Sequence, residues 1–110
     1  MADTLGTFEQ AVLLAIVRLG EDAYGRAIMT EVRERLDREV AAGAVHATLE
    51  RLERKRLVHS KLDDGTPIRA GRARRYYRLQ PAGARALENA RKAVHTLWRG
   101  IPRLLQGGMS

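Results

Sequence analysis

The hydrophobic pattern of this chain changes its period once, near residue 56, and this change limits the folds open to it. Before residue 56, apolar residues recur every three to four positions, as they do along one face of a helix. Two short segments follow, residues 57–62 and 74–79, whose composition and alternation are typical of strands. Residues 63–67 between them, Asp-Asp-Gly-Thr-Pro, favour a turn. We therefore expect the order helix, helix, helix, hairpin, helix.

Local signals place the ends of the first three helices. The first is expected over residues 7–19, with Thr7 as its N-cap and Gln10 completing a capping box. The second is expected over residues 24–36 and the third over residues 43–56. The short break between the second and third helices predicts a helix-turn-helix arrangement.

Length and composition bound the class of protein. A chain of 110 residues fits one domain of modest size. It has no cysteine, which excludes a disulfide scaffold, a thiolate nucleophile and any cysteine-ligated metal site. The start of the chain is acidic and unlike a signal peptide, and no apolar run approaches the roughly 20 residues that span a bilayer. We expect a cytoplasmic protein with no membrane partner.

Charge divides the chain into an acidic and a basic half. Residues 1–50 hold five arginines and nine acidic residues, a net charge of −4, whereas residues 51–110 carry a net charge of +11. A basic half of this kind points to a polyanion such as nucleic acid. Its arginines gather in and beside the hairpin, where they would contact the DNA backbone or enter a minor groove. The candidate DNA-binding residues of the hairpin are Arg69, Arg72, Arg74 and Arg75.

The third helix has one apolar face and one face of very small side chains. Val45, Leu49 and Leu52 recur at i, i+4 and i+7 and should be buried. On the other face, small side chains would let the backbone lie close to base pairs in a major groove, while a histidine and an arginine reach a phosphate or a base edge. The alternative is that the small residues serve only helix–helix packing. The candidate recognition residues are Gly43, Ala44, His46, Ala47 and Arg51.

The last helix should begin near Pro81, and Pro102 should end it near residue 98–100. Along it, apolar residues recur every seven positions in two offset rows, as in the a/d seam of a coiled coil. This seam predicts a homodimer interface. A second hypothesis gives Trp98 a role in binding a flat hydrophobic ligand, the alternative being that it only packs. The candidate interface residues are Leu87, Ala90, Val94, Leu97, Trp98 and Ile101.

The chain resembles the PadR-type transcriptional regulators, specifically short members with one C-terminal helix. The resemblance covers residues 5 to about 90, and it is carried by residues 5–10, 12–16, 22–25, 43–55, 71–79 and 81–83. It implies a dimeric DNA-binding repressor in which residues 43–56 are the recognition helix and residues 69–75 belong to the wing. It also implies, for some short members, a cavity between subunits that accepts flat hydrophobic ligands.

Three positions depart from the pattern of that family. Ala41 stands where many members have Ser or Thr, so the third helix lacks a good N-cap. His46 replaces a common Tyr, which alters a phosphate or base contact. Arg56 replaces the usual Gly after the recognition helix and would be strained in a left-handed C-cap. These departures weaken any transfer of a particular operator sequence.

The sequence thus predicts a mainly α (α+β) fold: a winged helix-turn-helix over residues 1–79, a dimerisation helix over residues 80–106 and a frayed tail over residues 107–110. The predicted function is sequence-specific binding of a pseudo-palindromic double-stranded DNA operator by a homodimeric repressor. Alternatives are a protein-interaction winged helix and a non-specific nucleic-acid-binding module. No catalytic, metal-ligand or nucleotide-phosphate constellation stands out, so we expect no enzyme, no metal and no cofactor.

Overall fold

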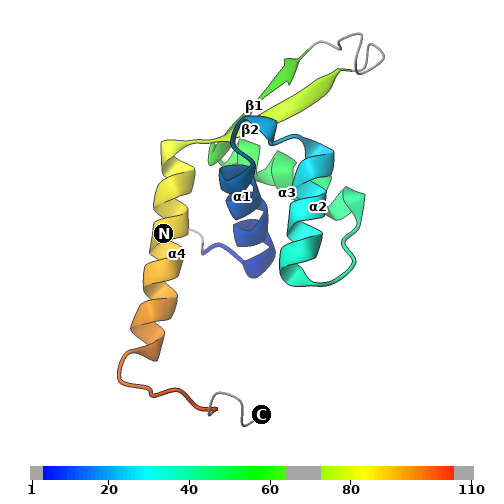
Figure 1. Ribbon diagram of the computed structural model, residues 1–110. Coiled ribbons are helices and arrows are strands. Elements are labelled where there is room, and N and C mark those ends of the chain that lie inside the picture. The colour runs from blue at the N-terminus through cyan, green and yellow to red at the C-terminus, as the bar shows by residue number, and fades with distance from the viewer. Residues whose placement is uncertain (1–3, 64–72, 106–110) are drawn as a thin grey trace.

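The computed structural model of the protein describes residues 4–63 and 73–105. Within them, four α-helices and one hairpin follow the expected order, which confirms the predicted α+β winged helix-turn-helix. In Figure 1 the hairpin projects from one end of the first three helices, and the last helix runs along their side. The elements are α1 (Thr7–Leu19), the 3₁₀ turn η1 (Gly20–Asp22), α2 (Gly25–Leu36), α3 (Ala42–Arg54), β1 (Val58–Asp63), β2 (Arg74–Leu79) and α4 (Pro81–Trp98).

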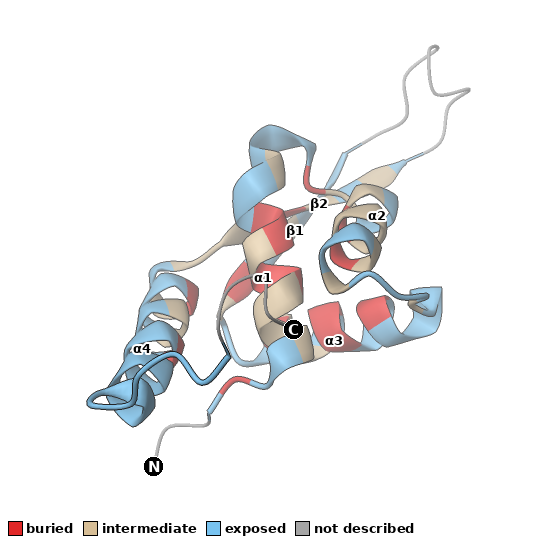
Figure 2. Ribbon diagram, turned by 60° about the horizontal axis from the view of Figure 1, so that its bottom comes forward, coloured by how far each residue is buried: buried red, intermediate tan, exposed pale blue. Residues whose placement is uncertain are grey.

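One hydrophobic core holds these elements together. Its largest fully buried side chains include Leu13 of α1, Ile28 of α2, and Leu49 and Leu52 of α3. Tyr77 of β2 is also buried in this core, so the hairpin is anchored to the helices through one of its two faces. Figure 2 shows buried residues on the facing sides of α1 and α3, while most of α4 is exposed. Burial of each of the large aliphatic side chains contributes about 1.5–3 kcal/mol.

The predicted capping of α1 is wrong by one residue. Gly6, in extended conformation, is the N-cap, and Thr7 is the first helical residue. The carboxylate of Glu9, three residues after the cap, accepts the backbone N–H of Gly6 at 3.0 Å. A glutamate at this position satisfies the cap N–H whether or not the cap has a side chain of its own. Gln10 instead donates to the carbonyl of Leu5 at 3.1 Å.

Both ends of α3 show the weaknesses expected from the sequence. Ala41 is the N-cap and provides no side-chain hydrogen bond. At the other end the chain leaves the helix through a Schellman motif, in which the N–H of Leu57 bonds to the carbonyl of Leu52 at 3.0 Å. Arg56 has a φ of +63°, the left-handed conformation that glycine adopts most easily. The helix ends two residues earlier than predicted.

The hairpin is antiparallel and starts with Val58 opposite Leu79. Its second strand is fixed to the connection between α1 and α2, because the N–H of Tyr77 donates to the carbonyl of Ala23 at 2.8 Å. The alternation predicted for residues 74–79 is confirmed, since Tyr77 points into the core. The hairpin therefore has a fixed base beside α3.

The first turn of α4 is packed tightly against the end of α3. The N–H of Gln80 donates to the carbonyl of Leu57 at 2.9 Å. A Cβ placed on Gly83 would lie 2.2 Å from the same carbonyl oxygen, so only glycine fits there. The helix ends at Trp98, and Gly100 follows with a φ of +83°, in agreement with the predicted break. The assignment of residues 80–106 to the dimerisation helix is too long, because residues 99–105 are not helical.

Two features are absent from the described residues. None of their helices is both long and apolar enough to cross a membrane. Nor do three or more of their histidine, aspartate or glutamate side chains come together as a metal ion would require.

Replacing Gly83 by alanine should destabilise the protein. The new methyl group would overlap a backbone carbonyl that cannot rotate away, so α4 must shift, at a cost of about 1–3 kcal/mol. Gly43→Ala is the matched control, since nothing lies within 4 Å of its Cβ position and alanine favours a helix by about 0.5–1 kcal/mol. Urea unfolding of both variants measures the difference; equal stabilities would show that α4 is not tightly seated at Gly83.

Candidate DNA-binding surface

The small face of α3 is open to solvent. Gly43, Ala44 and Ala47 are all exposed, so they are not buried between helices within the described part of the chain. A hollow of about 390 Å³ runs beside Ala44 and Ala47, and Phe8 of α1 and Val40 form part of its lining. An α3 backbone bearing only small side chains here can approach another molecule closely, as readout in a major groove requires.

His46 lies at the edge of a second hollow, on the opposite side of α3. This hollow, of about 450 Å³, is lined among others by Arg26 of α2, His46, and Arg75 of β2. The imidazole Nε2 is 3.7 Å from a carboxylate oxygen of Glu50 one turn later, and both side chains are well exposed. The structure thus brings one predicted residue of α3 and one predicted residue of the hairpin to the same concave surface.

Arg51, the other predicted contact residue of α3, is held by α1. Its Nε–H donates to a carboxylate oxygen of Glu9 at 3.3 Å, and its Nη2 donates to Thr48 at 3.4 Å. Lys55 lies 3.5 Å from the same oxygen of Glu9. The Glu9 side chain is only 12% exposed, whereas that of Arg51 is 43% exposed. A single carboxylate therefore holds two cations of α3.

Arg75 is tied to α3 by a hydroxyl bridge that the sequence analysis did not identify. Its Nη1 donates to the hydroxyl of Ser60 at 2.9 Å, and that hydroxyl donates to a carboxylate oxygen of Glu53 at 2.7 Å. Ser60 lies directly opposite Tyr77 in the hairpin, on the face that meets α3. The alternation of β1 placed it on that face, but only the packing of the hairpin against α3 brings Glu53 within reach.

The other predicted arginines of the hairpin divide into two groups. Arg69 and Arg72 lie outside the described residues. Arg74 is described, and its guanidinium lies over the ring of Tyr24, 4.0 Å from the centroid. Tyr76 packs edge-on against the same ring, at 5.7 Å between centroids. Arg74 therefore fastens the hairpin to the start of α2, and its removal would affect stability as well as charge.

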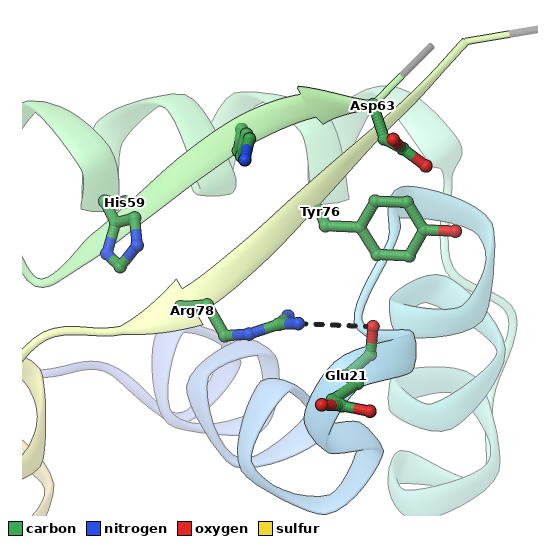
Figure 3. A pocket seen from close by; sticks show the side chains of 6 residues that line it. Glu21, His59, Asp63, Tyr76 and Arg78 are labelled. Carbon is green, nitrogen blue, oxygen red and sulfur yellow. Dashed lines mark hydrogen bonds between the residues drawn. The ribbon is translucent and has the colours of Figure 1, made fainter. Parts of the chain in front are cut away.

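The outer face of the hairpin is attached to η1. Figure 3 shows the hydrogen bond from Arg78 to the backbone carbonyl of Glu21, and Arg78 also donates to the carbonyl of Gly20 at 3.1 Å. The shallow hollow in this view, of about 320 Å³, has a lining of mixed charge that includes His59 and Asp63. His59 interacts through Nδ1 with the side-chain amide of Gln80.

The predicted seam of α4 divides into a covered and an uncovered part. Leu87 packs against the core of its own chain, and Ala90 is 8% exposed. These two positions are therefore already covered without a partner, because the first half of α4 lies against the helical core. Beyond Ala90 the apolar seam is exposed to solvent: Leu97 is 78% exposed and Trp98 is 51% exposed. The large apolar side chains left exposed here are Val94, Leu97, Trp98, Ile101, Leu104 and Leu105.

Two side chains near α3 have shifted pKa values. Burial alone raises the pKa of the Glu9 carboxyl, but the hydrogen bonds from Gly6 and Arg51 and the charges of Lys55 and Arg51 outweigh burial and hold the pKa below its usual value. Burial, assisted by the charge of Glu53, raises the pKa of the Tyr77 hydroxyl. Glu9 is thus ionised over the whole neutral range, and Tyr77 is neutral there.

A helix-turn-helix whose second helix has an exposed face of small side chains, followed by a basic hairpin, is typical of winged-helix transcriptional regulators. The PadR family transcription regulator of Clostridium difficile R20291 is 25% identical, with a TM-score of 0.69, over 86% of this chain and 93% of that chain. A PadR family transcriptional regulator from Eggerthella lenta DSM 2243 is 29% identical, with a TM-score of 0.64, over 82% and 76% of the two chains.

Residues 13–89 match the transcriptional regulator PadR-like family, and the chain belongs to that family. The same fold is found in BpsR of Bordetella bronchiseptica, whose DNA binding is regulated by 6-hydroxynicotinic acid. That protein is 19% identical, with a TM-score of 0.62, over 93% of this chain and 72% of that chain. No curated protein matches the chain significantly.

The Glu9 interactions should make stability depend on pH in acid. Because the folded pKa of Glu9 lies below its unfolded value, its contribution is complete above about pH 5 and is lost as the pH falls through the folded pKa. Glu9→Gln should cost about 1–2 kcal/mol at pH 7, as hydrogen bonds to charged groups do, and progressively less below about pH 4. Urea unfolding at a series of pH values tests this, and a difference independent of pH would contradict it.

Proposed function

We propose that this PadR-like regulator binds a specific double-stranded DNA operator as a homodimer and represses transcription by occluding a promoter. The observation that carries the proposal is the exposed small face of α3, Gly43 with Ala44 and Ala47, together with a hairpin whose Arg75 is connected to Glu53 of the same helix through Ser60. The small face suits entry into a major groove. The net charge of +11 on residues 51–110 supplies the attraction to phosphates.

In this proposal, the residues of α3 and those of the hairpin have different roles, which follow from their position and charge. The first turns of α3, with His46, are assigned to base readout in the major groove. The hairpin arginines are assigned to the phosphate backbone of the neighbouring minor groove, because their charge carries no sequence information of its own. Arg69 and Arg72 keep the wing role predicted for them from the sequence. Glu53 and Ser60 are assigned to orienting Arg75.

The proposed dimer forms through the exposed part of α4. The exposed apolar side chains at the end of α4 and after it are unfavourable in water, and pairing with a second copy of the chain would bury them. A two-fold dimer would place two copies of α3 in successive major grooves of a pseudo-palindromic site, about 10 bp apart. Trp98 would lie at this interface, where a flat hydrophobic effector is proposed to bind and to change the spacing of the two wings.

The operator experiment compares anisotropy of a labelled duplex from upstream of the coding sequence with that of a scrambled duplex, over several salt concentrations. We expect a preference of about 10³-fold or more at physiological salt. Arg75→Ala should weaken binding to both duplexes and lower the salt slope by roughly 0.9 per protomer, because one phosphate contact is lost. Arg91→Ala on α4, whose side chain is 78% exposed, is the control for simple loss of charge.

Other outcomes of this experiment favour other functions. Equal and steeply salt-dependent binding to both duplexes would favour a non-specific nucleic-acid-binding module. Absence of binding at low salt would favour a winged helix that contacts a protein partner. An unchanged salt slope for Arg75→Ala would show that the hairpin residue does not contact phosphate.

The dimer is tested by placing a charge on the exposed seam. Leu97→Glu should convert the dimer to monomer at micromolar concentration, because burying an unpaired carboxylate at the interface costs several kcal/mol. Sedimentation velocity measures the oligomeric state, and the emission of Trp98, the only tryptophan of the chain, should shift to longer wavelength on exposure. Lys92→Glu, also on exposed α4 but outside the seam, is the control. A variant that stays dimeric would place the interface elsewhere.

A further inference from the structure

We infer that Arg51 is a phosphate-binding residue and that Glu9 is the residue that positions it. This inference rests on the proposed DNA binding and deepens it. It also changes the role expected for Arg51 from the sequence alone, where contact with a base edge and contact with a phosphate were both open. The geometry of its guanidinium favours the phosphate.

The guanidinium is already fixed on one side. Its Nε–H donates to Glu9 at 3.3 Å, and one N–H of Nη2 donates to Thr48, which is 3% exposed. Within the described residues, Nη1 donates to no acceptor. Arg51 therefore presents a charged N–H edge whose orientation is set before any ligand arrives, and preorganisation of this kind reduces the entropic cost of binding.

Arg51 lines the hollow between the start of α1 and the exposed face of α3. The small side chains Ala44 and Ala47 form part of the same lining, and its charged residues are Arg38, Glu39 and Arg51. A DNA strand whose bases face α3 presents its sugar–phosphate backbone beside the helix. Two arginines against one glutamate give the lining a net positive charge, which favours a phosphate there.

Base reading by Arg51 would require the side chain to leave Glu9. The base-contacting residues of a recognition helix lie in its N-terminal turns, and Arg51 lies in the third turn of α3, on the side toward α1. Turning the guanidinium toward a base edge would break its bond to Glu9, a carboxylate only 12% exposed. The carboxylate would keep Gly6 and Lys55 but lose its strongest cationic donor. The arrangement is therefore stable for a phosphate contact and unfavourable for a base contact.

The test uses the full-length protein, the operator duplex, a scrambled duplex and a set of operator variants that each change one base pair. Arg51→Ala should weaken binding to all of these duplexes by the same factor, about 10-fold, and reduce the salt slope by roughly 0.9 per protomer. Arg51→Lys keeps the charge but cannot bond to Glu9 and Thr48 together, so it should behave like Arg51→Ala. Arg91→Ala again controls for charge lost far from α3.

A double-mutant cycle isolates the role of Glu9. With Glu9 present, Arg51→Ala should cost about 10-fold; in a Glu9→Gln background the same change should cost no more than about 2–3-fold, because the arginine is no longer oriented. A merely structural role for Glu9 would lower stability but leave the cost of Arg51→Ala unchanged. Thermal unfolding of each variant identifies loss of fold, and Arg51→Lys keeps the test valid if Glu9→Gln is unstable.

Each result has a defined meaning. A loss confined to particular base pairs would show that Arg51 reads sequence and would overturn the inference. Full retention of affinity by Arg51→Lys, or additivity in the cycle, would remove the positioning role of Glu9. If the wild-type protein does not distinguish the operator from the scrambled duplex, the proposed function fails. If it does and Arg51→Ala leaves the salt slope unchanged, only this inference fails.

Discussion

The backbone at Leu57 connects α3, the hairpin and α4. Its N–H closes the Schellman motif on Leu52, and its carbonyl accepts the N–H of Gln80 at 2.9 Å. The same carbonyl lies against Gly83, where no larger residue fits. Since three elements meet at this one residue, a rotation of any of them would break one of these contacts. The positions of the wing and of α4 relative to α3 follow from this junction.

The backbone conformation of the residue just before Leu57 costs free energy. Arg56 adopts a left-handed conformation, which disfavours side chains with a Cβ by about 1–2 kcal/mol. Two gains in free energy offset this cost: the turn directs Val58 into the core, and it starts β1 in register with β2. A cationic side chain at this exposed position also adds to the positive charge near the C-terminal end of α3, where the helix dipole favours it.

Two carboxylates organise the positive charge of the proposed DNA-binding surface. Glu9 holds Arg51 and Lys55 from the side of α1, and Glu53 holds Arg75 through Ser60 from the side of the hairpin. Besides their contribution to stability, these interactions have a geometric effect: they hold flexible cationic side chains close to the conformation in which a phosphate would meet them. One acid from each half of the chain, Glu9 and Glu53, thus contributes to the proposed binding of an anion.

Periodicity and turn chemistry were enough to predict the order of elements, the exposed small face at Gly43 and a break in the last helix near residues 98–100, but not that residues 99–105 are non-helical. They could not predict contacts between residues distant in sequence. Glu9 and Arg51 are 42 positions apart, and their meeting depends on how α1 crosses α3. Arg74 carried the charge expected of a wing contact, but a charge count does not show that its guanidinium lies on Tyr24. The N-cap of α1 was misplaced because glycine offers no side-chain signal.

The connection at Leu57 also restricts how an effector could act. An effector near Trp98 would bind at the far end of α4, whose first turn is fixed to the end of α3. In the proposed dimer, a change in the crossing angle of the two α4 helices would therefore rotate each α3 and its hairpin together as a rigid unit. Because the half-sites of an operator lie about one helical turn apart, a rotation that changes the spacing of the two α3 helices would weaken binding. In the proposed arrangement an effector would alter operator affinity through the geometry of the proposed dimer, with the exposed face of α3 itself unchanged.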